Sequence, residues 1–310
     1  MKNKILITGA EGFLGYHLIN YLCKNTKHRI FGTYLKKKNL LTYGNLKYLN
    51  CDIRKKSHII NIINKTKPNI IFHLAAKSHP NFSFKYPSET LNTNVIGTSN
   101  LLEVIKNKKI NPKIVIACSS AQYGARDLKE HPLDEKAGFM PEHVYGLSKN
   151  FQNFLSEQYF KMFKLKLYNA IIFNTSGPGK NNDIFFDISK QYNQQIKNKV
   201  IKIKCGNLRN KRDFLHYEDT VKGLYQIAKK GTPGQSYNIS TGKLIEIKKL
   251  LIYLKKKSNK KIIIESEKKR FRTFDEKYTS GKNLKLRKLG WKPRKDFKDI
   301  LNEMCHKLGR

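Results

Sequence analysis

Three glycines spaced three residues apart follow a short apolar run at the start of the chain. The run Lys4–Thr8 is apolar and β-branched, and Gly9, Gly12 and Gly15 come directly after it. Apolar residues then recur at helical spacing, so the segment predicts a strand, a tight turn and a helix. Such glycines allow the turn, the approach of a diphosphate and close helix–strand packing, and the helix N-terminus favours anions. We predict a dinucleotide-binding unit here; a plain turn with packing glycines is the alternative.

Apolar runs alternate with helical patterns through the first half of the chain. Further strands are predicted at 29–34, 46–50, 69–76, 113–118 and 166–173, and long helices begin at Pro87 and at about residue 142. This alternation is typical of right-handed crossovers and of a parallel sheet covered on both faces. The predicted fold class is therefore α/β, a Rossmann-type doubly wound parallel sheet with a smaller C-terminal α/β substrate-binding part.

The segment after the second predicted strand bears on the choice of dinucleotide. Such a strand ends in Asp or Glu where the ribose hydroxyls of NAD are bound. Here it runs into Thr33-Tyr34-Leu35 and then Lys36-Lys37-Lys38, so a carboxylate is missing and three cations follow. This favours the 2′-phosphate of NADP(H). NAD(H) remains possible, and an ordinary solvated lysine loop is the alternative interpretation.

A tyrosine and a lysine lie four positions apart early in the second long helix. Tyr145 and Lys149 therefore share one helix face. A phenol loses its proton at about pH 10, and a neighbouring ammonium favours the phenolate, so the pair can transfer a proton near neutral pH. The same spacing also occurs on solvated helix faces. Ligands on parallel sheets bind beyond the carboxyl ends of the strands, and Gly9, Ala75-Ala76, Ser119 and Tyr145 are all expected in that region.

Four motifs occur in a fixed order along the chain. They are Gly-x-x-Gly-x-x-Gly from Gly9, His-Leu-Ala-Ala at 73–76, Ser-Ser-x-x-Tyr-Gly at 119–124 and Tyr-x-x-x-Lys at 145–149. In this order they resemble the extended short-chain dehydrogenase/reductase family of nucleotide-sugar enzymes, over essentially the whole chain. The resemblance implies the catalytic residues Ser119, Tyr145 and Lys149. The cofactor-binding residues expected with it are Gly9, Gly12, Phe13, Leu14, Gly15, Lys36, Asp52, Ile53, Leu74, Ala75, Ala76, Asn94, Tyr145 and Lys149.

The resemblance also implies a division of the chain and a substrate site. An NAD(P)-binding Rossmann domain is expected at 1–173, with a return segment at about 213–239, and a mainly sugar-nucleotide-binding part at 174–310. Gly-Asn-Leu at 206–208 and Arg-Asp-Phe at 212–214 resemble the branch of GDP-mannose 4,6-dehydratase and GDP-4-dehydro-6-deoxymannose reductase. The substrate-binding residues expected from this branch are Asn174, Lys190, Arg212 and Arg272.

Each of these substrate residues has a chemical reason and a structural alternative. By the resemblance, Arg212 and Arg272 hold the diphosphate, a bidentate task suited to guanidinium groups. Asn174 is expected at the diphosphate-sugar region. Alternatively, Asn174 closes a turn, and Arg212-Asp213 forms a surface ion pair.

Two positions depart from the pattern of the branch. The arginine that usually stands three residues before Asn174 is Ile171, so one anchor is missing. The 4,6-dehydratases carry a glutamate two residues after the catalytic hydroxyl, to abstract the proton next to the ketone. That position is Ala121, and alanine cannot act as a base. Elimination chemistry is therefore disfavoured unless another carboxylate substitutes.

These observations lead to an expected activity. We expect NADPH-dependent reduction of the C4 ketone of a nucleotide-linked 4-keto-6-deoxy sugar, with GDP-4-dehydro-6-deoxy-D-mannose as the first choice of substrate. The alternatives are a nucleotide-sugar 4-epimerase and then a GDP-mannose 4,6-dehydratase. From a different class, a non-catalytic dinucleotide-binding or RNA-binding protein is the remaining alternative.

Composition bears on partners and compartment. The net charge is +39, but lysine is spread over nearly every helix and loop, so we expect no nucleic-acid partner. Five cysteines without a Cys-x-x-Cys pair, and nine histidines without ligand spacing, predict reduced thiols and no metal site. No apolar run approaches a membrane span and no signal peptide is recognisable, which predicts a cytoplasmic protein without a membrane partner. Members of the family commonly dimerise through the two long helices, so a homodimer is expected.

Overall fold

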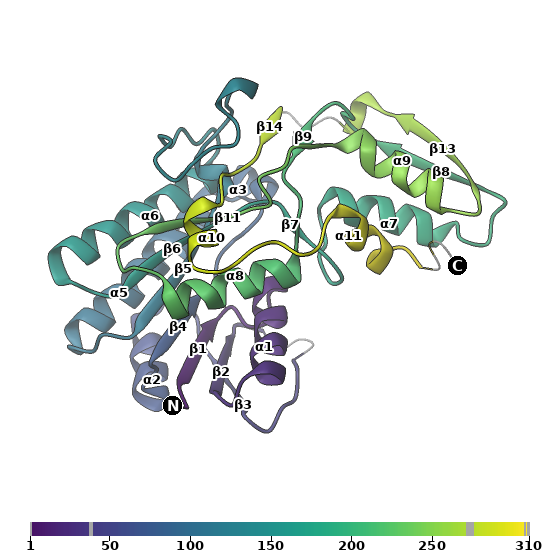
Figure 1. Ribbon diagram of the computed structural model, residues 1–310. Helices are drawn as coiled ribbons and strands as arrows, with labels where there is room; N and C mark the ends of the chain where they lie inside the picture. The colour runs from purple at the N-terminus through teal and green to yellow at the C-terminus, as the bar shows by residue number, and fades with distance from the viewer. Residues whose placement is uncertain (1, 37–39, 271–275, 307, 309–310) are drawn as a thin grey trace.

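The computed structural model describes residues 2–36, 40–270, 276–306 and 308, and is drawn in Figure 1. At its centre is a seven-stranded sheet in the order β11-β6-β5-β4-β1-β2-β3, parallel at every pairing. Its strands are β1 (Lys4–Thr8), β2 (Arg29–Tyr34), β3 (Leu46–Asn50), β4 (Ile70–His73), β5 (Lys113–Ser119), β6 (Leu167–Ile172) and β11 (Ser236–Ile239). The predicted α/β fold with a Rossmann-type doubly wound parallel sheet is confirmed.

Helices cover both faces of this sheet. One face carries α1 (Phe13–Asn25), α8 (Tyr217–Lys230) and α10 (Leu284–Lys288). The other carries α2 (Lys56–Thr66), α5 (Gly97–Asn107) and α6 (Val144–Phe163). Short helical segments in the connections are α3 (Pro80–Lys85), α4 (Pro87–Leu91), the π-helix η1 (Asn92–Ile96), and the 3₁₀ turns η2 (Ser120–Gln122) and η3 (Leu128–Glu130).

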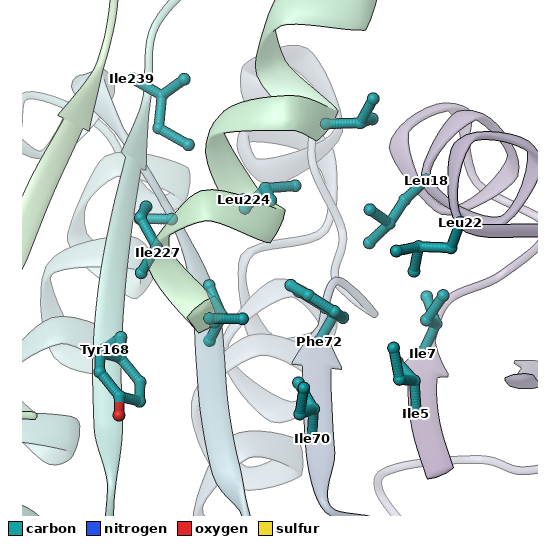
Figure 2. Close-up of a cluster of buried hydrophobic side chains, with 14 of the residues drawn as sticks. Ile5, Ile7, Leu18, Leu22, Ile70, Phe72, Tyr168, Leu224, Ile227 and Ile239 are labelled. Atoms are coloured by element: carbon teal, nitrogen blue, oxygen red, sulfur yellow. The ribbon is translucent and has the colours of Figure 1, made fainter. Parts of the chain in front are cut away.

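The alternation of side chains along β1 explains why two cores form. Ile5 and Ile7 point to the face covered by α1 and α8, and Leu6 points to the opposite face. In Figure 2, Ile5 and Ile7 lie beside Leu18 and Leu22 of α1. Because both faces are buried, the strand is apolar at consecutive positions, as is typical of parallel sheets.

The second half of the chain builds a smaller part with its own core. Its strands are β7 (Thr175–Ser176), β8 (Val200–Cys205), β9 (Lys211–Arg212), β10 (Leu215–His216), β12 (Ile245–Glu246), β13 (Lys261–Ser266) and β14 (Tyr278–Thr279). Its helices are α7 (Ile184–Gln194), α9 (Ile247–Lys257), η4 (Lys268–Arg270) and α11 (Phe297–Met304). β8 and β13 pair in parallel, and α7, α9 and α11 pack with them in one buried cluster. In Figure 1 this part lies at the upper right, beside the large sheet.

Two predicted elements differ from those observed. The long helix expected from Pro87 is divided into α4, the π-helix η1 and α5, because the backbone changes its hydrogen-bond spacing at Asn92–Ile96. The strand expected at 69–76 ends at His73, so the three residues after it leave the sheet. Both differences lie at the carboxyl edge of the sheet.

In the described parts of the chain, no helix is long and apolar enough to cross a membrane.

Candidate active site

A large cleft lies along the carboxyl ends of the parallel strands. Its volume is about 1390 Å³. One wall comes from the turn after β1, the ends of β2, β4 and β5, and the first turns of α6. The other comes from β9 and from residues around β7, α7 and β8. The cleft therefore lies between the large sheet and the smaller part, where ligands bind on folds of this kind.

The glycine turn gives this cleft a close-fitting backbone surface. Gly9 has φ 71°, and a Cβ there would lie 2.8 Å from backbone atoms of Ala75. A Cβ on Gly15 would lie 2.2 Å from the carbonyl oxygen of Gly9, so any side chain would push α1 off the strand. Gly12 caps α1 without a side-chain hydrogen bond, which leaves the first N–H groups of the helix to a ligand. These features fit the diphosphate of a dinucleotide.

The predicted catalytic residues all lie in the cleft. Ser119 ends β5, and Tyr145 and Lys149 lie one turn apart on α6. The Lys149 ammonium donates a hydrogen bond to the carbonyl oxygen of Ala117 at 2.8 Å. Tyr145 and Lys149 are only 8% and 3% exposed, so both are held within the protein and reach the cleft over a small area. The structure thus brings together three residues that the sequence separates by up to thirty positions.

The protonation of this pair differs from the sequence-based expectation. Burial raises the pKa of Tyr145 to about 12, while a hydrogen bond with Ser119 acts in the opposite direction. Burial also lowers the pKa of Lys149 to about 8. The expected lowering of the phenol pKa by the ammonium is not seen in this structure, because burial of the phenol has the largest effect and Lys149 is not among the groups that shift this pKa. At neutral pH the phenol is therefore protonated and able to donate a proton.

A histidine that sequence reasoning missed caps the helix that carries these residues. The Nδ1 atom of His143 accepts a hydrogen bond from the N–H of Gly146 at 3.0 Å. Its ring stacks on that of Tyr145, with the centroids 6.0 Å apart. Burial lowers the pKa of His143, so the ring is neutral and carries its proton on Nε2. Sequence reasoning placed His143 inside the helix expected from about residue 142, so nothing marked it as a cap.

Most predicted cofactor-binding residues line the cleft, but two do not. Those that line it are Gly9, Gly12, Phe13, Leu14, Gly15, Asp52, Ile53, Leu74, Ala75, Ala76, Tyr145 and Lys149. Lys36 is exposed and lies outside the lining, and Lys37 and Lys38 lie outside the described residues. Asn94 is fully buried and is not among the residues that line the cleft, so the structure does not place it at the predicted cofactor contact.

The role of Asn94 is to hold neighbouring segments together. Its side chain accepts a hydrogen bond from the N–H of Lys77 at 2.8 Å and donates to the carbonyl oxygen of the same residue at 3.0 Å. It also donates to the hydroxyl of Ser148 on α6 at 2.9 Å. The π-helix turns this side chain inward, a geometry that a regular helical pattern does not predict.

Two of the four predicted substrate residues line the cleft. Asn174 and Arg212 line the cleft, and the Asn174 amide donates to the carbonyl oxygen of Asp213 at 3.4 Å. Lys190 is exposed on α7 and does not line the cleft, because it lies about a turn beyond Asp187, the last residue of that helix that does. Arg272 lies outside the described residues. Asp213 is fully buried, so the surface ion pair considered for Arg212-Asp213 does not form.

Other residues of the cleft were not recognised from the sequence. Glu11, within the glycine motif, lines it beside the end of β2. Lys180 lies over the ring of Phe13, with Nζ 5.3 Å from the centroid, and burial lowers the pKa of this lysine. Lys204 and Asn207 reach the cleft from the smaller part. Among the described side chains, no group of three or more His, Cys, Asp or Glu residues could hold a metal ion.

The fold and the contents of the cleft together define a class of enzyme. A doubly wound sheet with a dinucleotide turn at its first strand, and a Ser, Tyr and Lys at its carboxyl edge, is that of the extended short-chain dehydrogenases/reductases. Within this class, the family model of GDP-mannose 4,6 dehydratase matches residues 6–304. The chain belongs to that family of nucleotide-sugar enzymes.

Individual relatives agree with this assignment. The chain is 31% identical to the dTDP-D-glucose 4,6-dehydratase of Dictyostelium discoideum, over 77% of this chain and 58% of that protein. It is 25% identical to the GDP-mannose 4,6 dehydratase of Homo sapiens, over 98% of this chain and 91% of that one. Among solved structures, RMD from Pseudomonas aeruginosa complexed with NADPH has a TM-score of 0.81 at 22% identity, and each chain is covered to 99%. The UDP-glucose 4-epimerase of Thermotoga maritima has a TM-score of 0.85 at 21% identity, covering 97% of this chain and 96% of that one. These two structures support the fold.

Proposed function

We propose that the chain is an NAD(P)-dependent oxidoreductase that reduces the C4 ketone of a nucleotide-linked 4-keto-6-deoxy sugar. The first candidate substrate is GDP-4-dehydro-6-deoxy-D-mannose, because the chain belongs to the GDP-mannose 4,6 dehydratase family. The observation that carries the proposal is Ala121, which lines the cleft at the position where a dehydratase needs a carboxylate. Ser119, Tyr145 and Lys149 support hydride transfer, while a dehydratase would need another carboxylate of the cleft, such as Glu142, to substitute at the position of Ala121.

The protonation of Tyr145 favours reduction. A nicotinamide dinucleotide supplies the hydride, which forms the new C–H bond at C4. Tyr145, whose burial keeps it protonated, donates its phenolic proton to the ketone oxygen, so the carbonyl becomes an alcohol. The Ser119 hydroxyl donates a hydrogen bond to the same oxygen as negative charge develops there. The phenolate then regains a proton from water, and Lys149 stabilises it in the meantime.

The remaining predicted parts of the site belong to the same proposal. The glycine turn and Ala75-Ala76 would hold the dinucleotide, and the division at residue 173 would separate its domain from the sugar-nucleotide part. Arg212 would bind the diphosphate of the substrate, since this residue lines the far wall of the cleft and a guanidinium suits a diphosphate. Asn174 would lie nearer the sugar. The expectation of NADPH rested on Lys36–Lys38, but Lys36 lies outside the lining of the cleft. In this proposal the choice of dinucleotide depends instead on Glu11, which lines the cleft beside the end of β2.

The test is the oxidation of NADH or NADPH by purified protein with freshly made GDP-4-keto-6-deoxymannose. A control with GDP-mannose alone detects dehydration, and product analysis detects epimerisation. Loss of reduced dinucleotide with the keto sugar alone, in proportion to the alcohol formed, is the expected result. A product epimerised at C4 without net oxidation would make the chain an epimerase. A keto sugar formed from GDP-mannose would make it a dehydratase in spite of Ala121.

A further inference from the structure

Glu11 lies at the point where a dinucleotide-binding fold distinguishes two cofactors. The N–H of Ala10 donates to the carbonyl oxygen of Thr33 at 2.8 Å, which ties the glycine turn to the end of β2. Next to this contact, Oε1 of Glu11 accepts a hydrogen bond from the N–H of Leu35 at 2.9 Å. Glu11, Thr33 and Leu35 all line the cleft. The Glu11 carboxylate therefore occupies the end of β2, where the strand itself offers none.

The second carboxylate oxygen of Glu11 lacks a partner. Oε2 is covered and has no hydrogen-bond partner among the residues that the structure describes. A covered carboxylate oxygen without a donor is costly, so a hydroxyl group brought to it gains a charge-assisted hydrogen bond. A ribose diol supplies such hydroxyls. In dinucleotide-binding folds a carboxylate at the end of the second strand binds the ribose 2′-hydroxyl of NAD.

A 2′-phosphate at the same place meets the opposite electrostatics. A phosphate monoester carries a charge of about −1.5 to −2 at neutral pH, which the Glu11 carboxylate would repel at close range. Oε1 also takes the Leu35 N–H that a phosphate oxygen could otherwise accept. Among the lysines that the structure describes, Lys36 directly follows Leu35, but its side chain is exposed and lies outside the lining of the cleft.

We infer that Glu11 binds the adenosine ribose hydroxyls and selects NAD(H) over NADP(H), in place of the missing carboxylate at the end of β2. This replaces the sequence-based preference for NADP(H). The inference rests on the proposed function only in that the chain binds a nicotinamide dinucleotide. It does not depend on the sugar substrate.

The test measures binding and needs no turnover. The dissociation constants of NADH and NADPH are determined from their fluorescence at fixed ionic strength, for the wild type and for Glu11→Gln. Lys36→Ala tests the competing explanation. Glu103→Gln is the matched control, because Glu103 is a carboxylate that pairs with Lys56 and does not line the cleft. We expect the wild type to bind NADH at least about tenfold more tightly than NADPH. Glu11→Gln should shrink that ratio at least about tenfold, and the other two variants should leave it unchanged.

Tighter binding of NADPH by the wild type, or an unchanged ratio in Glu11→Gln, would overturn the inference. A second measurement avoids variants: AMP should compete with NADH on the wild type more strongly than 2′-AMP does, and the reverse order would contradict us. Failure here is distinguishable from failure of the proposed function. NADH binding without reduction of the keto sugar defeats only the proposed function, and reduction with a preference for NADPH defeats only the role of Glu11.

Discussion

At the scale of single residues, the phenol of Tyr145 is the group whose removal tests the chemistry most directly. Its burial holds the pKa at about 12, so it acts as a proton donor in the direction of reduction. Tyr145→Phe keeps the ring and its stacking on His143 but removes the proton. We expect turnover of the keto sugar to fall roughly a hundredfold or more, with the affinity for NADH unchanged. Near-wild-type turnover measured by NADH oxidation would refute the assignment.

Lys149 gives a prediction about pH. Its pKa falls from an ordinary 10.5 to about 8 on burial, so between these values the unfolded chain binds more protons than the folded one. Stability therefore rises with pH across this window, and at pH 7 the buried charge costs about 3 kcal/mol. Lys149→Met should remove this rise and, at pH 7, raise the free energy of unfolding, less the lost hydrogen bond to Ala117.

The check is urea unfolding of both proteins from pH 7 to 10.5, taking the difference between them at each pH. That difference isolates Lys149, because Cys118, whose pKa Lys149 lowers, still has a pKa of about 12 and stays protonated in the folded protein over this range, with or without Lys149. The advantage of the variant should shrink as pH rises. A constant difference would show that Lys149 keeps its ordinary pKa in the folded protein. The variant should also lose most of its catalytic activity, since it cannot stabilise the Tyr145 phenolate.

The same scale shows why some site residues could be predicted and others not. Gly9 follows β1 and Ser119 ends β5, and strand ends are visible in the sequence as the limits of apolar runs. Tyr145 lies on α6 and was found by its spacing from Lys149. Glu11 lies within the glycine motif, between Gly9 and Gly12, so its position was known from the sequence. Its contact with Leu35, however, spans two strands and depends on how the turn meets β2. Lys190 was expected from the resemblance to a branch of the family, which does not say where α7 leaves the cleft.

At the scale of elements, local sequence patterns located the strands but not the π-helix that interrupts the long helix predicted from Pro87. β2 and β3 are found at their predicted residues. In β2 an apolar run specifies a buried parallel strand, whereas β3 lies at the edge of the sheet and has no buried residue. The π-helix at Asn92–Ile96 was missed, since its residues suit an ordinary helix equally. What favours it is tertiary: there, the Asn94 side chain binds Lys77 and Ser148. No periodicity in the sequence carries such information.

Asp213 joins the segment between β9 and β10 to the residues that follow β11, and its loss should destabilise the fold. Its carboxylate accepts hydrogen bonds from the N–H and hydroxyl of Thr241, at 2.8 and 2.6 Å, and from the N–H of Gly242 at 2.8 Å. Asp213→Asn turns one acceptor into a donor that faces these donors. Because a buried donor left without a partner costs about 1–3 kcal/mol, we expect a loss of that size in urea unfolding.

The matched control is Asp134→Asn, which changes the same group in an accessible turn. Asp134 accepts hydrogen bonds from the N–H groups of Lys136 and Ala137, but water can replace it there. Its substitution should cost about 1 kcal/mol or less. Equal losses for the two variants would mean that the network around Asp213 contributes no more than a surface turn.

At the scale of the whole molecule, an apolar stripe on α6 remains uncovered. Leu147, Phe151, Phe154 and Met162 follow helical spacing and are 38%, 48%, 47% and 68% exposed. Ile96, on the neighbouring η1, is 50% exposed. A group of large exposed apolar side chains on one face typically marks an interface, and most soluble oligomers are symmetric. This is the surface through which we expect two copies of the chain to dimerise.

Phe151→Glu tests this expectation, because it places a charge near the middle of the stripe without touching the cleft. Sedimentation equilibrium at micromolar concentration should find the wild type as a dimer and the variant as a monomer. Ile252→Glu is the matched control: Ile252 is 52% exposed on α9, far from α6, and its substitution should leave the dimer intact. A wild type that sediments as a monomer, or a Phe151→Glu variant that still dimerises, would rule out this face. Since Tyr145 and Lys149 lie on the same helix, a monomeric variant with reduced turnover would further indicate that the dimer holds α6 in position for catalysis.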